Sequence, residues 1–266
     1  MEKKTLKTPI SYYGGKQRML RHIMPLIPEH TVYTEAFAGG AAVYFAKEAV
    51  ELEIINDING NLIAFYEAMK SHPRALVDKI KATLHSRKQH ALAWHIYNQP
   101  QGCSDIDRAW AVWVLCSQGF ASKISGVWGY DKSKRTMSKR IQNAKARFDL
   151  ELCARLERTT IECKDAIDVI ARYDSPDAFH YVDPPYFNSD CAHYSGYTED
   201  DFKKLLDVLS GVKGRFLLSS YPSDLLAGYT AANGWYQKEV DQKVSVNAKA
   251  GTGKVKTEVL TANYPI

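Results

Sequence analysis

Apolar segments and turn residues alternate in the first third of the chain. Residues 32–37 are predicted to form a strand, which ends before Gly39 and Gly40, and residues 41–50 are predicted to form a helix. A second strand is predicted at 52–56, and helices at 62–72 and from Pro73 onward, because proline suits the first turn of a helix. Strand, turn, helix and strand in this order predict a βαβ unit and a parallel sheet.

The pattern changes over residues 85–155, which are richer in Trp, Gln, Lys and Arg. Here the sequence predicts a helix at 110–120 and loops and turns at 121–140. Further on, strands are predicted at 159–165, 178–186 and 214–221, with a helix at 198–211 that Thr198 would cap. Two last strands, 234–242 and 256–264, are predicted to form a closing hairpin around a mobile segment, 243–255.

These elements predict an α/β fold with a Rossmann-like, mostly parallel sheet and a terminal antiparallel hairpin. Residues 1–84 and 156–266 would form the sheet domain, and residues 85–155 an inserted, mostly helical subdomain. The chain has 266 residues, 45% of them hydrophobic and 24% charged, as is usual for a soluble protein. No apolar run approaches the roughly 18 residues that span a membrane. The five cysteines are scattered without a C-x-x-C, which favours reduced thiols and no zinc site.

Positive charge is concentrated in one segment of the chain. The net charge is only +5, but residues 121–147 contain eight basic residues and one acid, Asp131. A local basic segment in an otherwise nearly neutral chain indicates a polyanionic partner. The alternative is that these residues form a solvated helix face. The basic residues are Lys123, Lys132, Lys134, Arg135, Lys139, Arg140, Lys145 and Arg147.

Several enzyme classes are disfavoured by motifs that the sequence lacks. Neither "YYGGKQ" nor "GTGKVK" has the spacing of a nucleotide phosphate loop, and there is no H-E-x-x-H or G-x-S-x-G motif. "EAFAGGAAV" is a glycine-rich turn between strand and helix, where a ligand could approach the backbone or the glycines could serve packing. Asp57 follows Gly39 by 18 residues and ends the next strand, near the offset of about 20 at which a carboxylate binds a ribose. Together they suggest a nucleoside-containing cofactor.

The sequence "DPPY", Asp183 to Tyr186, ends a predicted strand with two prolines. Prolines lack a backbone donor and stiffen the chain, and ligands of open α/β sheets bind at the carboxyl ends of strands. The Asp183 carboxylate and a nearby carbonyl could together accept the two hydrogens of an exocyclic amino group. Tyr186 could stack on the ring that bears this group.

These motifs, in this order and over nearly the full length, resemble the Dam-type family of DNA adenine-N6 methyltransferases found in bacteria and their phages. "YYGGK" resembles the family's W-A-G-G-K, "EAFAGGA" its F-x-G-x-G loop, and "DPPY" its catalytic motif. Tyr12 replaces the usual Trp, and Ala41 a frequent glycine. The resemblance implies S-adenosylmethionine as methyl donor, without a metal. The implied cofactor-binding residues are Tyr12, Gly14, Gly15, Lys16, Glu35, Phe37, Gly39, Gly40, Asp57, Ile58, Asp165, Ala166 and Asp183.

The resemblance also implies that Asp183, Pro184, Pro185 and Tyr186 are catalytic, and that the basic segment lies in a target recognition domain that binds double-stranded DNA. Arg135 and Arg140 are expected to read bases, whereas Trp128 could either stack on DNA or anchor the subdomain. A cytosine-N4 methyltransferase, a silent DNA-binding protein and an RNA substrate are the alternatives. We expect a cytoplasmic monomer or weak dimer in a bacterium or phage-infected cell. The implied DNA-binding residues are Lys123, Trp128, Lys132, Lys134, Arg135, Lys139, Arg140, Lys249 and Lys254.

Overall fold

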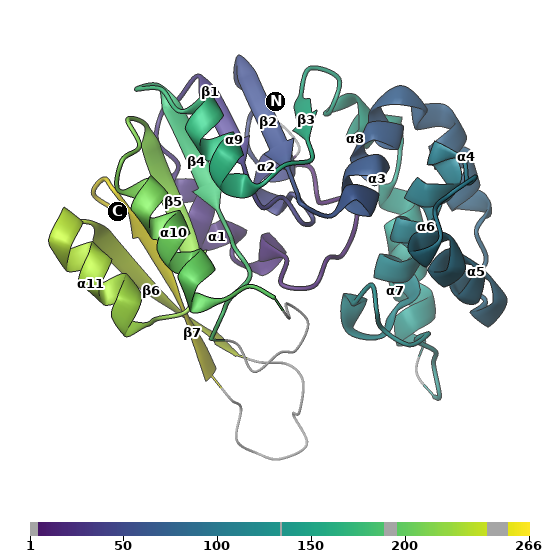
Figure 1. The fold of residues 1–266 in the computed structure, drawn as a ribbon. Coiled ribbons are helices and arrows are strands. Elements are labelled where there is room, and N and C mark those ends of the chain that lie inside the picture. The colour runs from purple at the N-terminus through teal and green to yellow at the C-terminus, as the bar shows by residue number, and fades with distance from the viewer. Residues whose placement is uncertain (1–4, 134, 189–195, 244–254) are drawn as a thin grey trace. The chain divides into compact units, whose positions relative to one another are not determined.

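The computed structural model describes residues 5–133, 135–188, 196–243 and 255–266. Within these ranges, seven strands form a sheet with the order β3-β2-β1-β4-β5-β7-β6 (Figure 1). The pairs β2–β3, β1–β4 and β4–β5 are parallel, and β7 is antiparallel to both β5 and β6. This confirms the predicted Rossmann-like sheet with its terminal antiparallel hairpin. The strands are β1 (Val32–Glu35), β2 (Leu52–Asn56), β3 (Thr160–Glu162), β4 (Ala178–Val182), β5 (Arg215–Ser220), β6 (Tyr236–Lys243) and β7 (Val255–Ala262).

The chain forms two compact units. The first comprises Met1–Leu20 and Ala38–Lys164, and contains η1 (Lys16–Arg18), α2 (Ala42–Ala46), α3 (Gly60–Ser71), α4 (Pro73–Ala82), α5 (Arg87–Asn98), α6 (Asp105–Gln118), η3 (Phe120–Ser122), α7 (Thr136–Arg147) and α8 (Leu150–Ala154). The second comprises Arg21–Phe37 and Asp165–Ile266, and contains η2 (Met24–Leu26), α9 (Ala166–Tyr173), α10 (Glu199–Leu209) and α11 (Asp224–Asn233). The short helix α1 (Leu20–Ile23) begins at the last residue of the first unit's opening segment.

The core of the first unit is built around α6. This helix is apolar on nearly every side, and its residues 109–118 are all buried, as expected of a central helix. It packs against α3, α4 and α5, which confirms the predicted helix near 110–120. Since α3 and α4 precede residue 85, the inserted segment shares a core with the segment before it. A separate recognition subdomain over 85–155 stays a prediction.

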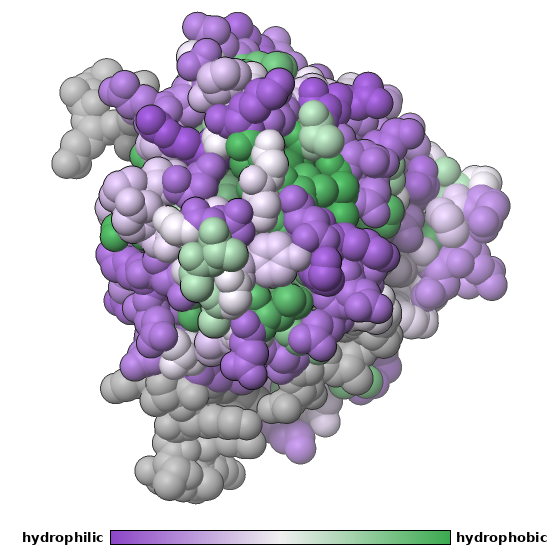
Figure 2. All heavy atoms as spheres, turned by 60° about the vertical axis from the view of Figure 1, so that its left-hand side comes forward, coloured by the Kyte–Doolittle hydropathy of each residue, from purple (hydrophilic) through white to green (hydrophobic). Residues whose placement is uncertain are grey.

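The core of the second unit lies between the sheet and the helices α9 and α10. Val182 and Phe216 on the strands pack with Phe202 and Leu206 on α10. The helix α10 begins at a capping box, in which Thr198 and Asp201 bind each other's backbone N–H groups, as the sequence indicated for Thr198. On the face that Figure 2 shows, hydrophilic side chains predominate and hydrophobic ones reach the surface in patches between them.

Two helix boundaries differ from the prediction. The helix expected over 41–50 ends at Ala46, because Lys47 is extended and directs its ammonium group to Glu53. The segment 121–140, expected to be irregular, becomes helical at Thr136. The carboxylate of Asp131 accepts the N–H groups of Met137 and Ser138, which lower the pKa of Asp131 to about 2. A cap this far from the helix start has no local sequence signature.

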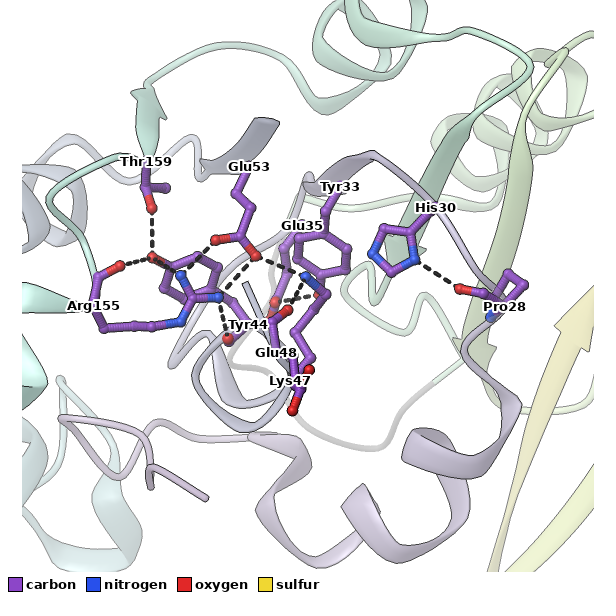
Figure 3. A network of polar contacts seen from close by, with 10 residues as sticks. All are labelled: Pro28, His30, Tyr33, Glu35, Tyr44, Lys47, Glu48, Glu53, Arg155 and Thr159. Carbon is purple, nitrogen blue, oxygen red and sulfur yellow. Dashed lines mark hydrogen bonds and ion pairs between the residues drawn. The ribbon is translucent and has the colours of Figure 1, made fainter. Parts of the chain in front are cut away.

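A buried ionic network joins β2, α2 and the end of α8 in the first unit (Figure 3). The carboxylate of Glu53 accepts hydrogen bonds from Lys47 at 2.7 Å and from Arg155 at 2.8 Å. The Arg155 guanidinium also lies over the Tyr44 ring, and the Tyr44 hydroxyl donates to the Arg155 carbonyl at 2.6 Å. Burial opposes ionisation of Glu53, but the bonds from Arg155 and Lys47 outweigh it and lower its pKa. Glu53 therefore stays ionised in the interior only because Lys47 and Arg155 bind its carboxylate.

Replacing Arg155 with Met should lower the free energy of unfolding by about 3 kcal/mol, as expected when a buried ion pair loses one partner. Urea denaturation at neutral pH measures this change. The exposed neighbour Arg158 provides the control, and Arg158→Met should stay within about 0.5 kcal/mol of wild type. Because the pKa of Glu53 is lower in the folded protein than its ordinary value of 4.5, its stabilisation is present above that pH and is lost as the pH falls further. The difference between wild type and Arg155→Met should therefore shrink in acid, and equal losses for both arginines would contradict the assignment.

Candidate active site

The N-terminal motif and the glycine loop, distant in sequence, pack together in the first unit. The chain turns at "YYGGK", where the Gly15 N–H donates to the Tyr12 carbonyl at 3.1 Å. The Tyr12 ring lies where a side chain on Gly39 would be, since a Cβ built there would meet its Cδ1 atom at 3.1 Å. Gly39 also has a φ of 49°, which favours glycine. Gly39 therefore has a packing role against Tyr12, whether or not the loop also binds a ligand.

Asp57 closes the glycine loop onto the turn after β2. Its Oδ2 atom accepts the Gly39 N–H at 3.0 Å, and its Oδ1 atom accepts the Asn59 N–H at 2.9 Å. Tyr66 holds the other side of the loop by donating to the Gly39 carbonyl at 2.7 Å. Burial raises the pKa of Asp57, and the two N–H bonds oppose this shift. Each carboxylate oxygen can accept a second bond, so Asp57 can shape the loop and also bind a hydroxyl group.

The other predicted cofactor residues of the first unit surround this loop. Ile58 is 76% exposed directly after Asp57, which is unusual for isoleucine. Lys16 is nearly buried and donates to the Gly14 carbonyl at 3.2 Å. Asn59, directly after Ile58, caps α3 and donates to the Tyr97 hydroxyl at 2.9 Å. The contact with Tyr97 on α5, which sequence reasoning missed, ties the inserted helices to the Asp57 turn.

In the second unit, the predicted cofactor residues lie at the ends of β1 and the start of α9. Glu35, the last residue of β1, is buried and accepts the Tyr33 hydroxyl at 2.8 Å. The Phe37 ring meets Tyr197 edge-on, at 6.4 Å between centroids. Asp165 is exposed and caps α9 through the Ile167 N–H, and Ala166 is buried beside it. The capping role alone would explain an aspartate at position 165.

The "DPPY" motif follows β4, whose five residues are all buried between β1 and β5. Asp183 and Tyr186 come together there, with the Tyr186 hydroxyl oxygen 3.3 Å from Asp183 Oδ1. That hydroxyl donates to Glu258 Oε1 on β7 at 2.6 Å, and the Ser219 hydroxyl on β5 donates to the same oxygen at 2.6 Å. Sequence reasoning missed Ser219 and Glu258. The sequence signal for Glu258 was a charged residue at the start of the apolar segment "EVLTA". A strand pattern alone does not connect this residue to Tyr186.

The Tyr186 side chain is half-buried as a whole, with its hydroxyl end inside the unit. Burial, and then the negative charges of Asp183 and Glu258, raise its pKa well above the ordinary value, so the phenol stays protonated. The ring also contacts Tyr221, at 4.4 Å between centroids and 59° between planes. After the motif, Phe187 packs against Phe202, while most of the loop expected to cover the site, 187–194, lies outside the described residues.

The helix α7 brings basic residues together along a cavity of about 560 Å³ in the first unit. Positions 139, 143 and 147 recur every four residues, which places their side chains along one stripe of α7, and Arg135 is the residue directly before this helix. Arg140 differs from its basic neighbours, because it is half-buried and donates to the Cys116 carbonyl at 2.8 Å. The residues that line the cavity are Ser11, Arg135, Thr136, Lys139, Arg140, Asn143 and Arg147.

The other predicted DNA-binding residues have mixed surroundings. Trp128 stacks with Tyr130 and lies under the Arg87 guanidinium, which is the environment of an anchor. Lys123 lies over the Tyr13 ring, 5.0 Å from its centroid, and Lys132 is exposed. Lys134, Lys249 and Lys254 lie outside the described residues, as does most of the segment 243–255 that was expected to be mobile.

Residues 12–240 match the model of the D12 class N6 adenine-specific DNA methyltransferases, and the chain belongs to this family. The reaction is therefore methylation of adenine N6 in DNA, which decides against the cytosine-N4 alternative. The match extends from the N-terminal "YYGGK" turn to the strand β6 and includes the "DPPY" motif. In the described part of the chain, no helix could span a membrane, and no three His, Cys, Asp or Glu side chains are grouped to hold a metal.

Relatives in bacteria are similar over most of the chain. The Type II methyltransferase M1.LlaDCHI of Lactococcus lactis is 25% identical, with 94% of this chain and 93% of the relative covered. The DNA adenine methylase of Vibrio cholerae is 28% identical over 75% of this chain and 74% of its own. The Retron Ec67 DNA adenine methylase of Escherichia coli is 23% identical, with 97% and 92% covered. A solved rRNA methylase from Streptococcus thermophilus is similar at a TM-score of only 0.34 and 10% identity, covering 92% of this chain and 93% of its own.

Replacing Gly39 with Ala should destabilise the protein more than the same change at Gly234. Both glycines have a left-handed φ, of 49° and 65°, so both variants carry a strain of about 1–2 kcal/mol. Only at Gly39 does the new Cβ meet another group, the Tyr12 ring, whereas nothing lies within 4 Å at Gly234. Thermal denaturation of the two variants compares them directly. Equal decreases in Tm would mean that Tyr12 does not pack on the loop as described.

Proposed function

We propose that this chain transfers the methyl group of S-adenosylmethionine to N6 of an adenine that is extruded from double-stranded DNA, with Asp183, Pro184, Pro185 and Tyr186 as the catalytic motif. The observation that carries this proposal is the cluster at the end of β4. There a carboxylate and a half-buried tyrosine ring, with its hydroxyl end held inside the protein, lie side by side. A base within a stacked duplex cannot reach such a site, so the adenine has to leave the helix.

The chain's residues have distinct roles in this proposal. Tyr186 provides a flat surface for the extruded base, while the Asp183 carboxylate and the Pro184 carbonyl accept the two N6 hydrogens. These bonds draw the nitrogen lone pair out of conjugation with the ring and aim it at the methyl donor. S-adenosylmethionine supplies an activated methyl group on a positively charged sulfur. Asp183 need not be a strong base, because the N6 proton can leave after the transfer.

The residues present suit the nucleoside part of such a donor. Asp57 is a half-buried carboxylate with acceptor capacity beyond its two backbone bonds, as binding of ribose hydroxyls requires. The neighbouring Ile58 offers exposed apolar surface to a base ring. For the other end of the donor, we propose Tyr12, Gly14, Gly15 and Lys16, and for its adenine, Asp165 and Ala166. Glu35, Phe37, Gly39 and Gly40 complete the proposed cofactor site.

The basic cavity along α7 is the proposed contact with the DNA backbone. Lys139 and Arg147 are exposed on one stripe of this helix and Arg135 is exposed directly before it, as phosphate binding requires. Arg140 is better suited to holding the helix on α6 than to reading a base, since it binds the Cys116 carbonyl. Base reading therefore falls in our proposal to Arg135. Lys123, Trp128 and Lys132 are kept as proposed DNA contacts. The protein is proposed to act in the cytoplasm, as a monomer or weak dimer.

Asp183→Ala should abolish methyl transfer, because the carboxylate acts on the reacting amine, whereas it should weaken the binding of S-adenosylmethionine, to which Asp183 is also expected to contribute, far less and leave DNA binding nearly unchanged. Transfer of labelled methyl groups to DNA measures the activity, and calorimetry measures cofactor binding. Asp177→Ala, in the exposed turn just before β4, is the control and should be fully active. The proposed function fails if Asp183→Ala methylates DNA at the wild-type rate.

Lys139→Gln should weaken DNA binding and flatten its dependence on salt. Each lost phosphate contact should reduce the slope of log affinity against log salt concentration by about 0.9. Arg135→Gln should add a loss of sequence preference, since we propose that it also contacts a base. Arg172→Gln, an exposed site on α9, is the control for a change in net charge alone. An unchanged slope for Lys139→Gln, measured by fluorescence anisotropy, would exclude the cavity as the backbone contact.

A further inference from the structure

Glu258 is a buried carboxylate that collects hydrogen bonds beside the catalytic motif. It lies on β7 and is 5% exposed. Its Oε1 atom accepts the hydroxyl groups of Tyr186 and Ser219, each at 2.6 Å, and its Oε2 atom accepts the side-chain amide of Gln242 on β6. A carboxylate is costly to bury without such donors. A neutral glutamine would cost less to bury in a purely structural role, so the charge of Glu258 at this place calls for a reason.

The distances indicate where the Tyr186 hydroxyl hydrogen points. A phenol has a single hydrogen to donate. Its oxygen is 2.6 Å from Glu258 and 3.3 Å from Asp183. The shorter distance is that of a charge-assisted O–H···O⁻ bond, and the longer one exceeds it by far. Because the pKa of Tyr186 is raised, the hydrogen stays on the phenol and is directed to Glu258.

The same bond fixes the ring of Tyr186. The hydroxyl end is held by Glu258 on β7, with Ser219 on β5 at 3.3 Å, and the ring contacts Tyr221 at a tilt of 59°. Lys256, two residues before Glu258 on β7, in turn donates to the Tyr221 hydroxyl at 3.2 Å. The terminal hairpin therefore holds the tyrosine through two neighbouring positions of one strand. A ring fixed at its far end and on one side can present a defined plane to a base.

We propose that Glu258 is a positioning residue for methyl transfer, which orients the Tyr186 ring and keeps the Tyr186 hydroxyl hydrogen away from Asp183. This inference rests on the proposed roles of Asp183 and Tyr186. Without the Glu258 charge, the phenol turns its hydrogen to the Asp183 carboxylate, 3.3 Å away. That bond then competes with the N6 amino group for the oxygen that accepts its hydrogen. Glu258 thus acts on the reaction through Tyr186 and touches neither the base nor the methyl donor.

A double-mutant cycle of Glu258→Gln and Tyr186→Phe tests this role. Glutamine keeps the shape of the side chain, but its neutral amide oxygen attracts the phenol less than the Asp183 carboxylate does. We expect Glu258→Gln to slow single-turnover methyl transfer about tenfold, a factor equivalent to 1.4 kcal/mol. In the Tyr186→Phe protein there is no hydroxyl hydrogen to redirect, so adding Glu258→Gln should change the rate less than twofold. Glu239→Gln, an exposed glutamate on β6 of the same hairpin, is the matched control and should have the wild-type rate.

Two further measurements separate positioning from folding and from failure of the proposed function. Affinity for S-adenosylmethionine should be the same in Glu258→Gln as in wild type, and fluorescence of 2-aminopurine at the target position should report a less ordered base. If Glu258→Gln slows the Tyr186→Phe protein as much as wild type, or has no effect on wild type, the inference is wrong although the function stands. If Asp183→Ala remains active, the proposed function itself is wrong.

Discussion

The architecture of the site depends on one constraint, the absence of backbone donors at two consecutive prolines. The strand β4 is fully buried between two parallel neighbours, and each residue in such a strand normally donates to the ladder. Pro184 and Pro185 cannot donate, so the ladder ends at Val182 and the chain has to leave the sheet there. Asp183 stands at this exit, at the sheet edge where α/β proteins bind their ligands. The fixed backbone makes the positions of Asp183 and Tyr186 reproducible.

A stiff backbone does not orient the side chains it carries, and the neighbouring strands complete this task. The Tyr186 hydroxyl is hydrogen-bonded to residues on β5 and β7. Without this contact, the hairpin of β6 and β7 would have only a structural role at the edge of the sheet. The partners come from sequence positions 33 and 72 residues further along the chain. The terminal hairpin is thus part of the site, although none of its residues belongs to a recognisable motif.

The sequence predicted the sheet and the motifs because both depend on local patterns. Alternating apolar segments, with Gly, Pro and Asp at strand ends, were sufficient to predict the strands β1, β2 and β4 and to place Asp57 and Asp183 directly after β2 and β4. The sequence analysis missed the features that depend on contacts between residues far apart in the chain. Glu258 looks like an ordinary strand residue until the register with β5 places it beside Ser219 and Tyr186. Likewise, Asp131 caps α7 from outside the helix, so a helix was predicted as a loop.

The basic segment shows why residue type alone does not define a DNA-binding surface. Arg135 and Arg140 are equivalent in a list of charges, and both suit a guanine. The structure separates them, because Arg135 is the residue directly before α7, whereas Arg140 lies within the helix. Arg140 lies next to the buried Ile141 and spends a donor on the carbonyl of Cys116, whereas Arg135 stays exposed. The bond from Arg140 to Cys116 is the reason why we propose only Arg135 as a base reader. The spacing of Lys139, Asn143 and Arg147 along α7, which a loop prediction leaves out, therefore defines the proposed DNA-binding surface better than a count of charges does.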